Sequence, residues 1–255
     1  MAEVRTRIGA PIWIDIATDQ VEASKTFYSG LFGWEAADIT DRDAGGYGMF
    51  KLDGKDVAGV GPTQGPGQPT AWSVYIGTED AAEVAAKVEA AGGTVVAPPF
   101  DVFEAGRMAV FQDPAGAFIS VWQPGAMPGA QVLYQPNSFG WAELSSRDFD
   151  RAVGFYQQVF GWTTKVSPMG EGMGDYTEFQ IDGESIAGGM PASPEAPAEM
   201  PSYWLVYFTV ADLDESFRKA VELGATEMMP PSPYPGGRFA IVSDPQGAAF
   251  GLLSS

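Results

Sequence analysis

Hydrophobic and polar residues alternate over short stretches of this chain, and helical spacing follows the first of them. Residues 13–17 alternate as a half-buried strand does, and apolar positions between residues 21 and 32 then recur on one helical face. Gly33 can end this helix, because glycine readily adopts the left-handed conformation common at helix C-termini. The pattern predicts a strand followed by a helix.

Further apolar stretches complete this unit. Residues 47–52 and 57–60 are predicted strands, and Asp53-Gly54 between them is typical of a hairpin turn. The order is therefore β-α-β-β, with room for one more strand. The next part of the chain repeats this order, with a helix at residues 81–91 and strands at residues 72–76, 94–97, 107–111 and 118–122.

The whole pattern then occurs a second time. Trp13-Ile14-Asp15-Ile16 recurs as Trp141-Ala142-Glu143-Leu144, at an offset of 141 − 13 = 128 residues. The motifs Phe27-Tyr28, Phe32-Gly33-Trp34 and Asp113-Pro114-Ala115-Gly116 return as Phe155-Tyr156, Phe160-Gly161-Trp162 and Asp244-Pro245-Gln246-Gly247. Because the repeat extends over each half, we expect two copies of one domain.

Segments rich in proline and glycine mark the expected boundaries. Residues 124–129, Pro-Gly-Ala-Met-Pro-Gly, are poor in apolar periodicity and rich in residues that break helices and strands. We predict a first domain at residues 1–124, a linker at 125–136 and a second domain at 137–255. Similar stretches at residues 61–69 and 191–201 divide each domain again, which gives four modules.

Composition excludes several classes of function. The chain has 14 Lys and Arg against 33 Asp and Glu, and its net charge of −19 would repel the phosphate backbone of nucleic acids. It has no Cys and no His, so disulfides, thiolate catalysis and the most common metal ligand and general base are all missing. No stretch approaches the length of an apolar membrane span. We expect a cytoplasmic protein with neither a nucleic-acid nor a membrane partner.

The repeated motifs resemble those of the vicinal-oxygen-chelate superfamily, which includes glyoxalase I, bleomycin and fosfomycin resistance proteins and extradiol dioxygenases. Phe27-Tyr28 with Leu31-Phe32-Gly33-Trp34 is similar to the family's F-Y-x-x-L-F-G-W signature, and residues 113–116 are similar to its D-P-x-G turn. The likeness is greatest to two-domain actinobacterial members named glyoxalase-like or hydroxylase proteins. It implies an α+β fold of four βαβββ modules, which form two tandem domains with cup-shaped mixed sheets and a cleft inside each cup.

The resemblance also implies where a metal would bind. In metal-using relatives a His lies on the first strand of a module, and a Glu lies four residues after the Gly of the D-P-x-G turn. The corresponding positions here are Trp13, Ser73, Ser120, Trp141, Leu205 and Gly251. None of these is a good ligand, so we expect no metal and no other cofactor. A hard cation held by Asp15, Glu143, Glu178 and water is the alternative.

Strand alternation predicts which side chains line the cups. If Ile14 and Ile16 face the helices, then Trp13 and Asp15 face the cleft, and Trp141 and Glu143 do the same in the second copy. The other expected lining residues are Tyr47, Tyr75, Arg107, Phe111, Trp122, Tyr176, Tyr207 and Arg238. Aromatic walls with a few charged groups suit a flat, conjugated organic molecule. Alternatively, the rings fill the cups or form the contact between the tandem domains, and the two arginines neutralise Asp15 and Glu143.

Two functions follow. The first is a metal-free protein that binds an aromatic or conjugated metabolite or antibiotic. The second is a metal-independent lyase, isomerase or hydroxylase-type enzyme of secondary metabolism or aldehyde detoxification. It would use Asp15 or Glu143 as the general base, with Tyr75, Tyr207 or an arginine polarising an oxygen. Metal-dependent chemistry ranks third, because its ligands are missing. The sequence leaves open whether the protein forms a homodimer.

Overall fold

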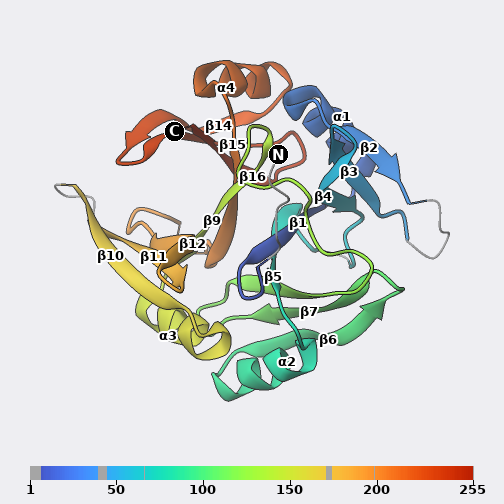
Figure 1. Ribbon diagram of the computed structural model, residues 1–255. Coiled ribbons are helices and arrows are strands. Elements are labelled where there is room, and N and C mark those ends of the chain that lie inside the picture. Colours follow the sequence, from blue (N-terminus) through green and yellow to red (C-terminus); the bar gives the residue numbers. More distant parts are fainter. Residues whose placement is uncertain (1–6, 40–44, 66, 171–173, 198, 255) are drawn as a thin grey trace.

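Two eight-stranded sheets, one from each half of the chain, form the structure (Figure 1). This computed structural model describes residues 7–39, 45–65, 67–170, 174–197 and 199–254. The first half contains β1 (Pro11–Ala17), α1 (Val21–Phe32), β2 (Glu35–Asp38), β3 (Gly48–Leu52), β4 (Lys55–Gly61), β5 (Ala71–Gly77), α2 (Ala81–Ala90), β6 (Thr94–Val102), β7 (Gly106–Gln112) and β8 (Phe118–Pro124). The second half contains β9 (Ser138–Ser146), α3 (Phe149–Phe160), β10 (Thr163–Gly170), β11 (Gly174–Ile181), β12 (Glu184–Pro191), β13 (Tyr203–Thr209), α4 (Leu213–Glu222), β14 (Thr226–Tyr234), β15 (Gly237–Ser243) and β16 (Ala249–Ser254).

The two sheets have the same topology. Their strand orders are β2-β3-β4-β1-β5-β8-β7-β6 and β10-β11-β12-β9-β13-β16-β15-β14. In the first sheet β1 pairs in parallel with β4 and antiparallel with β5, so the two modules meet at the centre. Each module is a βαβββ unit, because β2 supplies the strand that the sequence left open. The predicted α+β fold of two tandem domains with cup-shaped mixed sheets is confirmed.

Local sequence explains where the elements begin and end. Gly33 ends α1 at φ 73°, in the left-handed conformation. Asp80 caps α2, because its side chain accepts hydrogen bonds from the backbone N–H groups of Ala82 and Glu83. Asp53 and Gly54 both have positive φ, at 51° and 75°, as a type I′ turn requires. None of the described helices is long and apolar enough to span a membrane.

The segment expected to act as a linker packs against the first sheet. The backbone N–H groups of Ala130 and Gln131 donate to the carbonyl oxygens of Ile12 (2.8 Å) and Asp56 (2.7 Å). Val132 and Leu133 are buried. Residues 125–133 therefore extend the surface of the first half, whereas the domain boundaries themselves remain a prediction.

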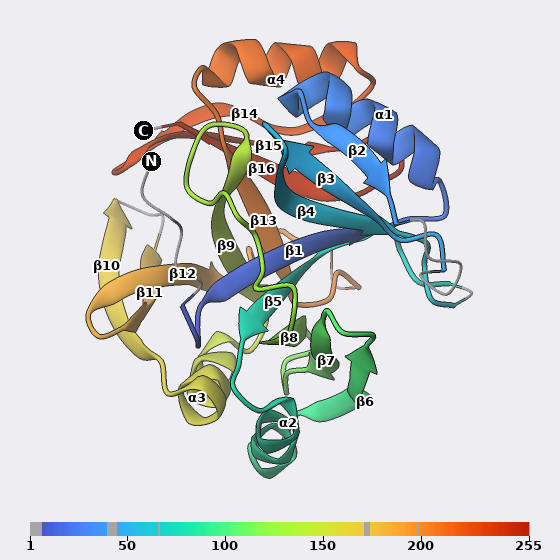
Figure 2. The ribbon, with the colours of Figure 1, turned by 45° about the vertical axis from the view of Figure 1, so that its right-hand side comes forward.

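The helices of each half pack against the other half. Figures 1 and 2 show α1 beside α4 and α2 beside α3. The hydroxyl of Tyr28 on α1 donates to Asp244 Oδ2 at 2.8 Å, and it accepts from Trp72 Nε1 at 2.9 Å. The ring of Phe32 lies 4.8 Å from that of Phe208, measured between centroids. The core is therefore shared between the halves.

An equivalent contact joins helix α3 of the second half to the first half. Tyr156 on α3 donates to Asp113 Oδ2 at 2.9 Å and accepts from Trp204 Nε1 at 2.7 Å. Each tyrosine thus joins a helix of its own half to the D-P-x-G turn of the other half.

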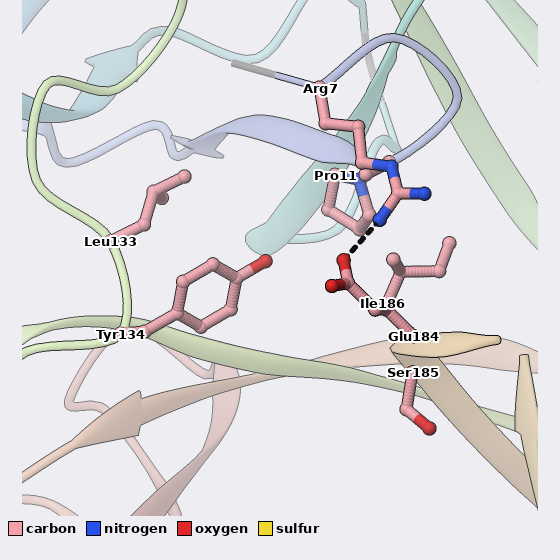
Figure 3. Close-up of a pocket in the computed structure, with 8 residues that line it drawn as sticks. Arg7, Pro11, Leu133, Tyr134, Glu184, Ser185 and Ile186 are labelled. Carbon is pink, nitrogen blue, oxygen red and sulfur yellow. Dashed lines mark hydrogen bonds and ion pairs between the residues drawn. The ribbon is translucent and has the colours of Figure 1, made fainter. Parts of the chain in front are cut away.

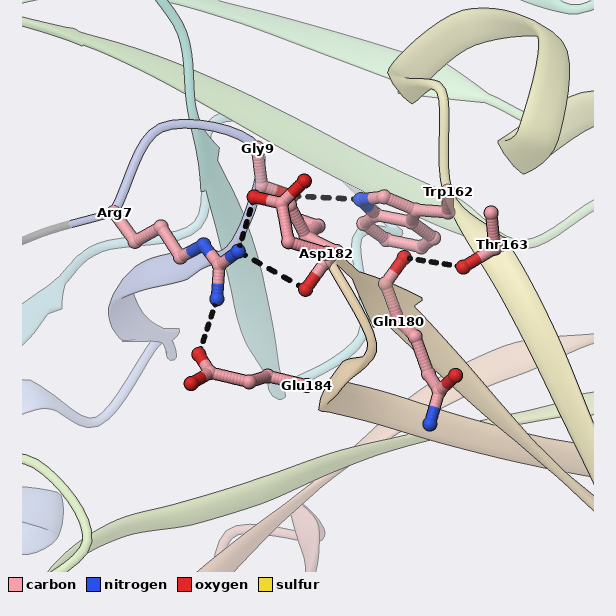
Figure 4. Close-up of polar contacts among 8 residues, drawn as sticks. Arg7, Gly9, Trp162, Thr163, Gln180, Asp182 and Glu184 are labelled. Atoms are coloured by element: carbon pink, nitrogen blue, oxygen red, sulfur yellow. Dashed lines mark hydrogen bonds and ion pairs between the residues drawn. The ribbon is translucent and has the colours of Figure 1, made fainter.

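The N-terminal segment adds a further connection between the halves (Figure 4). Trp162 Nε1 donates to the carbonyl oxygen of Gly9 at 2.7 Å, and Arg7 forms ion pairs with Asp182 (2.8 Å) and Glu184. Trp34 Nε1 forms the equivalent bond to the carbonyl oxygen of Asn137 at 2.8 Å.

We predict that Tyr28→Phe lowers the free energy of unfolding by about 1–3 kcal/mol, because Asp244 and Trp72 each lose a partner in the buried core. Tyr156→Phe should have a similar effect. Urea denaturation measures both, and Tyr203→Phe, at a side chain that is 36% exposed, is the control. Unchanged stability in the two buried variants would show that these bonds do not hold the halves together.

Candidate functional site

The concave face of the first sheet, called the first cup here, contains one carboxylate surrounded by aromatic side chains. Asp15 projects from β1, and its Oδ2 accepts hydrogen bonds from the hydroxyls of Tyr75 (2.9 Å) and Tyr47 (3.1 Å). Trp13 Nε1 in turn donates to the hydroxyl of Tyr47 at 3.2 Å. The four residues form one connected network, which agrees with the predicted alternation along β1.

The second cup, on the concave face of the second sheet, repeats this network with a longer acidic side chain. Glu143 Oε1 accepts from the hydroxyl of Tyr207 at 2.9 Å. Trp141 Nε1 donates to the hydroxyl of Tyr176 at 2.8 Å. The two cups are therefore copies of one arrangement, in which Asp15 and Glu143 take corresponding places.

Glycines in neighbouring strands let the tyrosine rings lie flat on the sheets. A Cβ added at Gly59 would lie 1.8 Å from the hydroxyl oxygen of Tyr47, and one added at Gly188 would lie 2.2 Å from that of Tyr176. A Cβ at Gly251 would lie 1.9 Å from Cδ1 of Tyr207. Any larger residue at these positions would displace a tyrosine from its carboxylate.

Burial shifts the pKa of the carboxyl group in both cups. It raises the pKa of Asp15 to about 6, although hydrogen bonds from Tyr75, Tyr47 and Ser73 act in the opposite direction. Burial also raises the pKa of Glu143. Burial and the charge of Asp15 keep the pKa of Tyr75 far above its usual value, so this hydroxyl remains a donor.

The two cups differ in their access to solvent. Trp13, Asp15 and Tyr75 are only 3%, 9% and 6% exposed, whereas Trp141 and Glu143 are half-buried. In the first cup the aromatic rings therefore fill much of the space, as the alternative interpretation expected. In the second cup, Trp141 and Glu143 each keep part of their surface exposed.

The segment after β8 explains part of this difference. Trp122 Nε1 donates to the carbonyl oxygen of Met127 at 2.8 Å, so the chain leaving the first half covers this ring, which is only 5% exposed. The corresponding residue of the second half is Leu253, at an offset of 253 − 122 = 131, and it is half-buried.

Two residues predicted to line the first cup lie on the opposite face of the sheet. On β7, Met108 pairs with Trp122, so its neighbour Arg107 points away from the cup. Phe111 pairs with Ile119 and is completely buried in the core. Arg107 forms its ion pair with Asp101 (3.3 Å) instead of Asp15. The predicted cup positions of Arg107 and Phe111 are therefore wrong.

Arg238 in the second half is misplaced for the same reason. Ile241 pairs with Gly251 below the ring of Tyr207, so Arg238, an odd number of positions away, faces the helices. It makes a bidentate ion pair with Asp214 at the start of α4, at 2.6 and 3.0 Å. The expected lining position of Arg238, and its alternative pairing with Glu143, are both wrong.

A separate cavity of about 220 Å³ lies between the two halves, outside both networks (Figure 3). Arg7 and Pro11 line it on one side, Leu133 and Tyr134 on a second, and Glu184 on a third. The guanidinium of Arg7 already forms ion pairs with Glu184 on β12 and with Asp182 in the hairpin before it.

A sequence model of the glyoxalase/bleomycin resistance protein/dioxygenase superfamily matches residues 11–121 and 138–252. The chain belongs to this superfamily. Within it, the chain is 40% identical over 261 residues to the anthracycline biosynthesis protein DauV of Streptomyces sp. strain C5, which covers 96% of this chain and 93% of DauV. The anthracycline biosynthesis protein DnrV of Streptomyces peucetius matches with the same identity and coverage.

A solved structure of the superfamily has the same fold. The Mn(II)-bound glyoxalase of Novosphingobium aromaticivorans aligns with a TM-score of 0.67 at 18% identity, over 97% of this chain and 82% of that protein. This likeness supports the architecture alone.

The side chains in the cups do not fit the divalent metal that some superfamily members hold. A metal centre needs several oxygen, nitrogen or sulfur ligands, but each network supplies a single carboxylate. The ring of Tyr207 covers Gly251, where metal-using relatives have a Glu. Within the described ranges, no group of three or more His, Cys, Asp or Glu residues could hold an ion.

Sequence reasoning missed the glycines that support the tyrosines. It named Ser73 and Ser120 only as positions where metal-using relatives have ligands, whereas in the sheet they pair with Asp15 and Tyr75. Glycine inside a strand often marks the close approach of another group, so Gly59 and Gly188 carried a usable signal. The place of the two serines beside Asp15 and Tyr75 depends on strand register, which the sequence does not give.

The raised pKa of Asp15 predicts a pH-dependent loss of stability. Folding favours the protonated carboxyl, so this contribution is complete below the unfolded pKa near 3.8 and is lost as the pH rises through about 6. Between about pH 4 and pH 7, the wild type should lose up to about 3 kcal/mol relative to Asp15→Asn. Urea denaturation across this range measures the difference.

Glu178→Gln is the control with the opposite sign, because hydrogen bonds from Ser185 and Lys165 lower the pKa of Glu178. Parallel pH profiles for the wild type and Asp15→Asn would contradict the assigned protonation of Asp15.

Proposed function

We propose that this superfamily member binds a small aromatic or conjugated organic molecule in its second cup, and that binding needs no divalent metal. One observation carries the proposal: the half-buried Glu143 lies beside the half-buried ring of Trp141, in a polar network with Tyr176 and Tyr207. A conjugated ligand could contact the indole, while one of its oxygens exchanges hydrogen bonds with the carboxylate or a tyrosine hydroxyl.

The relatives support the ligand class. DauV and DnrV are both named as anthracycline biosynthesis proteins, and anthracyclines contain a fused, conjugated ring system. A fused ring system with hydroxyl and carbonyl groups at its edge offers both the apolar face and the polar groups that this cup can recognise.

Further aromatic contacts extend the binding surface from Tyr207. The ring of Phe239 lies edge-on to Tyr207 at 6.4 Å and to Tyr234 at 6.1 Å between centroids, and Tyr234 is 40% exposed. These rings form a row from the carboxylate to the rim of the cup, long enough to contact more than one ring of a ligand.

We predict that Trp141→Phe weakens binding of an anthracycline aglycone about tenfold, because the ligand loses indole contact and Tyr176 loses a donor. Trp13→Phe is the matched control in the closed first cup and should leave the affinity unchanged. Isothermal titration calorimetry in the presence of EDTA measures both. Absence of binding, binding only after metal is added, or an equal loss in both variants would overturn the proposal.

A second candidate is a metal-independent enzyme with Glu143 or Asp15 as general base. The raised pKa values of both carboxyls favour it, since a base whose pKa lies nearer neutrality accepts a substrate proton more effectively. Glu143 would take a proton from the bound molecule, and the hydroxyl of Tyr207 would stabilise a neighbouring oxygen. Isomerisation or elimination would then follow without any redox partner.

This candidate predicts that Glu143→Gln abolishes conversion of the bound compound while its binding and the protein's folding persist. Mass spectrometry and chromatography of the recovered ligand measure conversion, and calorimetry measures binding. If wild-type protein returns every ligand unchanged, the binding function alone stands. Conversion that persists in Glu143→Gln would remove this residue from the mechanism.

A further inference from the structure

A groove of about 720 Å³ lies on the face of the second sheet opposite the second cup. It is lined by the start of α3, strands β10 and β11, the end of β12 and the segment that follows. On β11, Tyr176 faces the cup, whereas the next residue, Thr177, lines the groove. The groove is therefore a separate site and does not depend on the proposed function.

The equivalent place in the first half is filled by a lysine. The side chain of Lys25 on α1 is only 10% exposed, and its ammonium group pairs with Glu22 (2.6 Å) and with Asp38. The ammonium thus lies between the helix and strand β2, and its alkyl chain packs in the space that a groove would otherwise occupy.

The internal repeat shows what the second half has changed. At the common offset of 128 residues, Glu22 corresponds to Asp150 (22 + 128), Lys25 to Val153 (25 + 128) and Asp38 to Val166 (38 + 128). All three of these counterparts line the groove. The second half therefore keeps one carboxylate but lacks the internal cation.

The groove combines an apolar surface with negative charge. Phe149, Val153 and Val166 supply the apolar part, and Val166 is 58% exposed. Asp150 and Asp175 supply the charge, and neither forms an ion pair with a residue in the described part of the chain. An apolar group bearing a positive charge would satisfy both features.

We propose that this groove binds a small organic cation, a protonated primary amine on an apolar chain or ring. The ligand would take the place that the side chain of Lys25 takes in the first half. Its ammonium group would lie near Asp150, and its apolar part would lie against Phe149 and Val166.

Titration of the isotope-labelled protein with n-hexylammonium, followed by amide NMR shifts, tests this proposal. Shifts should map to the start of α3 and to β10. 1-Hexanol should bind at least fivefold more weakly, and hexanoate should not bind there. Equal affinity for hexylammonium and hexanol, or shifts confined to the cups, would overturn the proposal.

Variants locate the site. Val153→Lys copies the first half, so its own ammonium should fill the groove and abolish hexylammonium binding, whereas Val153→Leu should retain binding. Asp150→Asn, a surface change that preserves folding, should weaken binding about tenfold if the carboxylate holds the amine. Unchanged titrations in Val153→Lys and Asp150→Asn would show that the amine binds elsewhere.

Discussion

The structure depends on two buried hydrogen bonds that cross between its halves, from Tyr28 to Asp244 and from Tyr156 to Asp113. Each aspartate also accepts from backbone N–H groups of its own D-P-x-G turn; Asp113, for example, accepts from Ala115 and Ala117 at 2.8 and 3.0 Å. One carboxylate therefore fixes the turn before the last strand of its own sheet and anchors the helix of the other half. Because that last strand forms the floor of a cup beside β5 or β13, the interface between the halves and the shape of the cups are mechanically coupled.

The carboxylates in the cups are also buried, but only side chains donate hydrogen bonds to them. Burial of Asp15 disfavours its charge, and the tyrosine hydroxyls recover only part of the lost hydration, so its pKa stays near neutrality. A structural carboxylate would be more stable if fully paired. Tyr47 lies over Gly59 and Gly61, which leave room for its ring beside Asp15, so the network retains a polar centre within an aromatic wall.

Much of the fold could be predicted from the sequence, because the repeat and the alternation along residues 13–17 carry the module order and place Trp13 and Asp15 on the concave face. The errors at Phe111, Arg107 and Arg238 arise from strand register, since a shift by one position reverses every side chain. The sequence also could not predict that the helices of each half pack against the other half. The apolar face of a helix such as α1 shows that this face will be buried, but it does not identify the surface that covers it.

The covering of Trp122 by the carbonyl of Met127 has a consequence for how duplicated domains diverge. In a tandem repeat the segment that joins the two copies can cover the site of the first copy, as the backbone of Met127 covers Trp122, and so make two similar sites differ in their access to solvent. The connection between two domains can therefore act on a site as directly as a substitution within it.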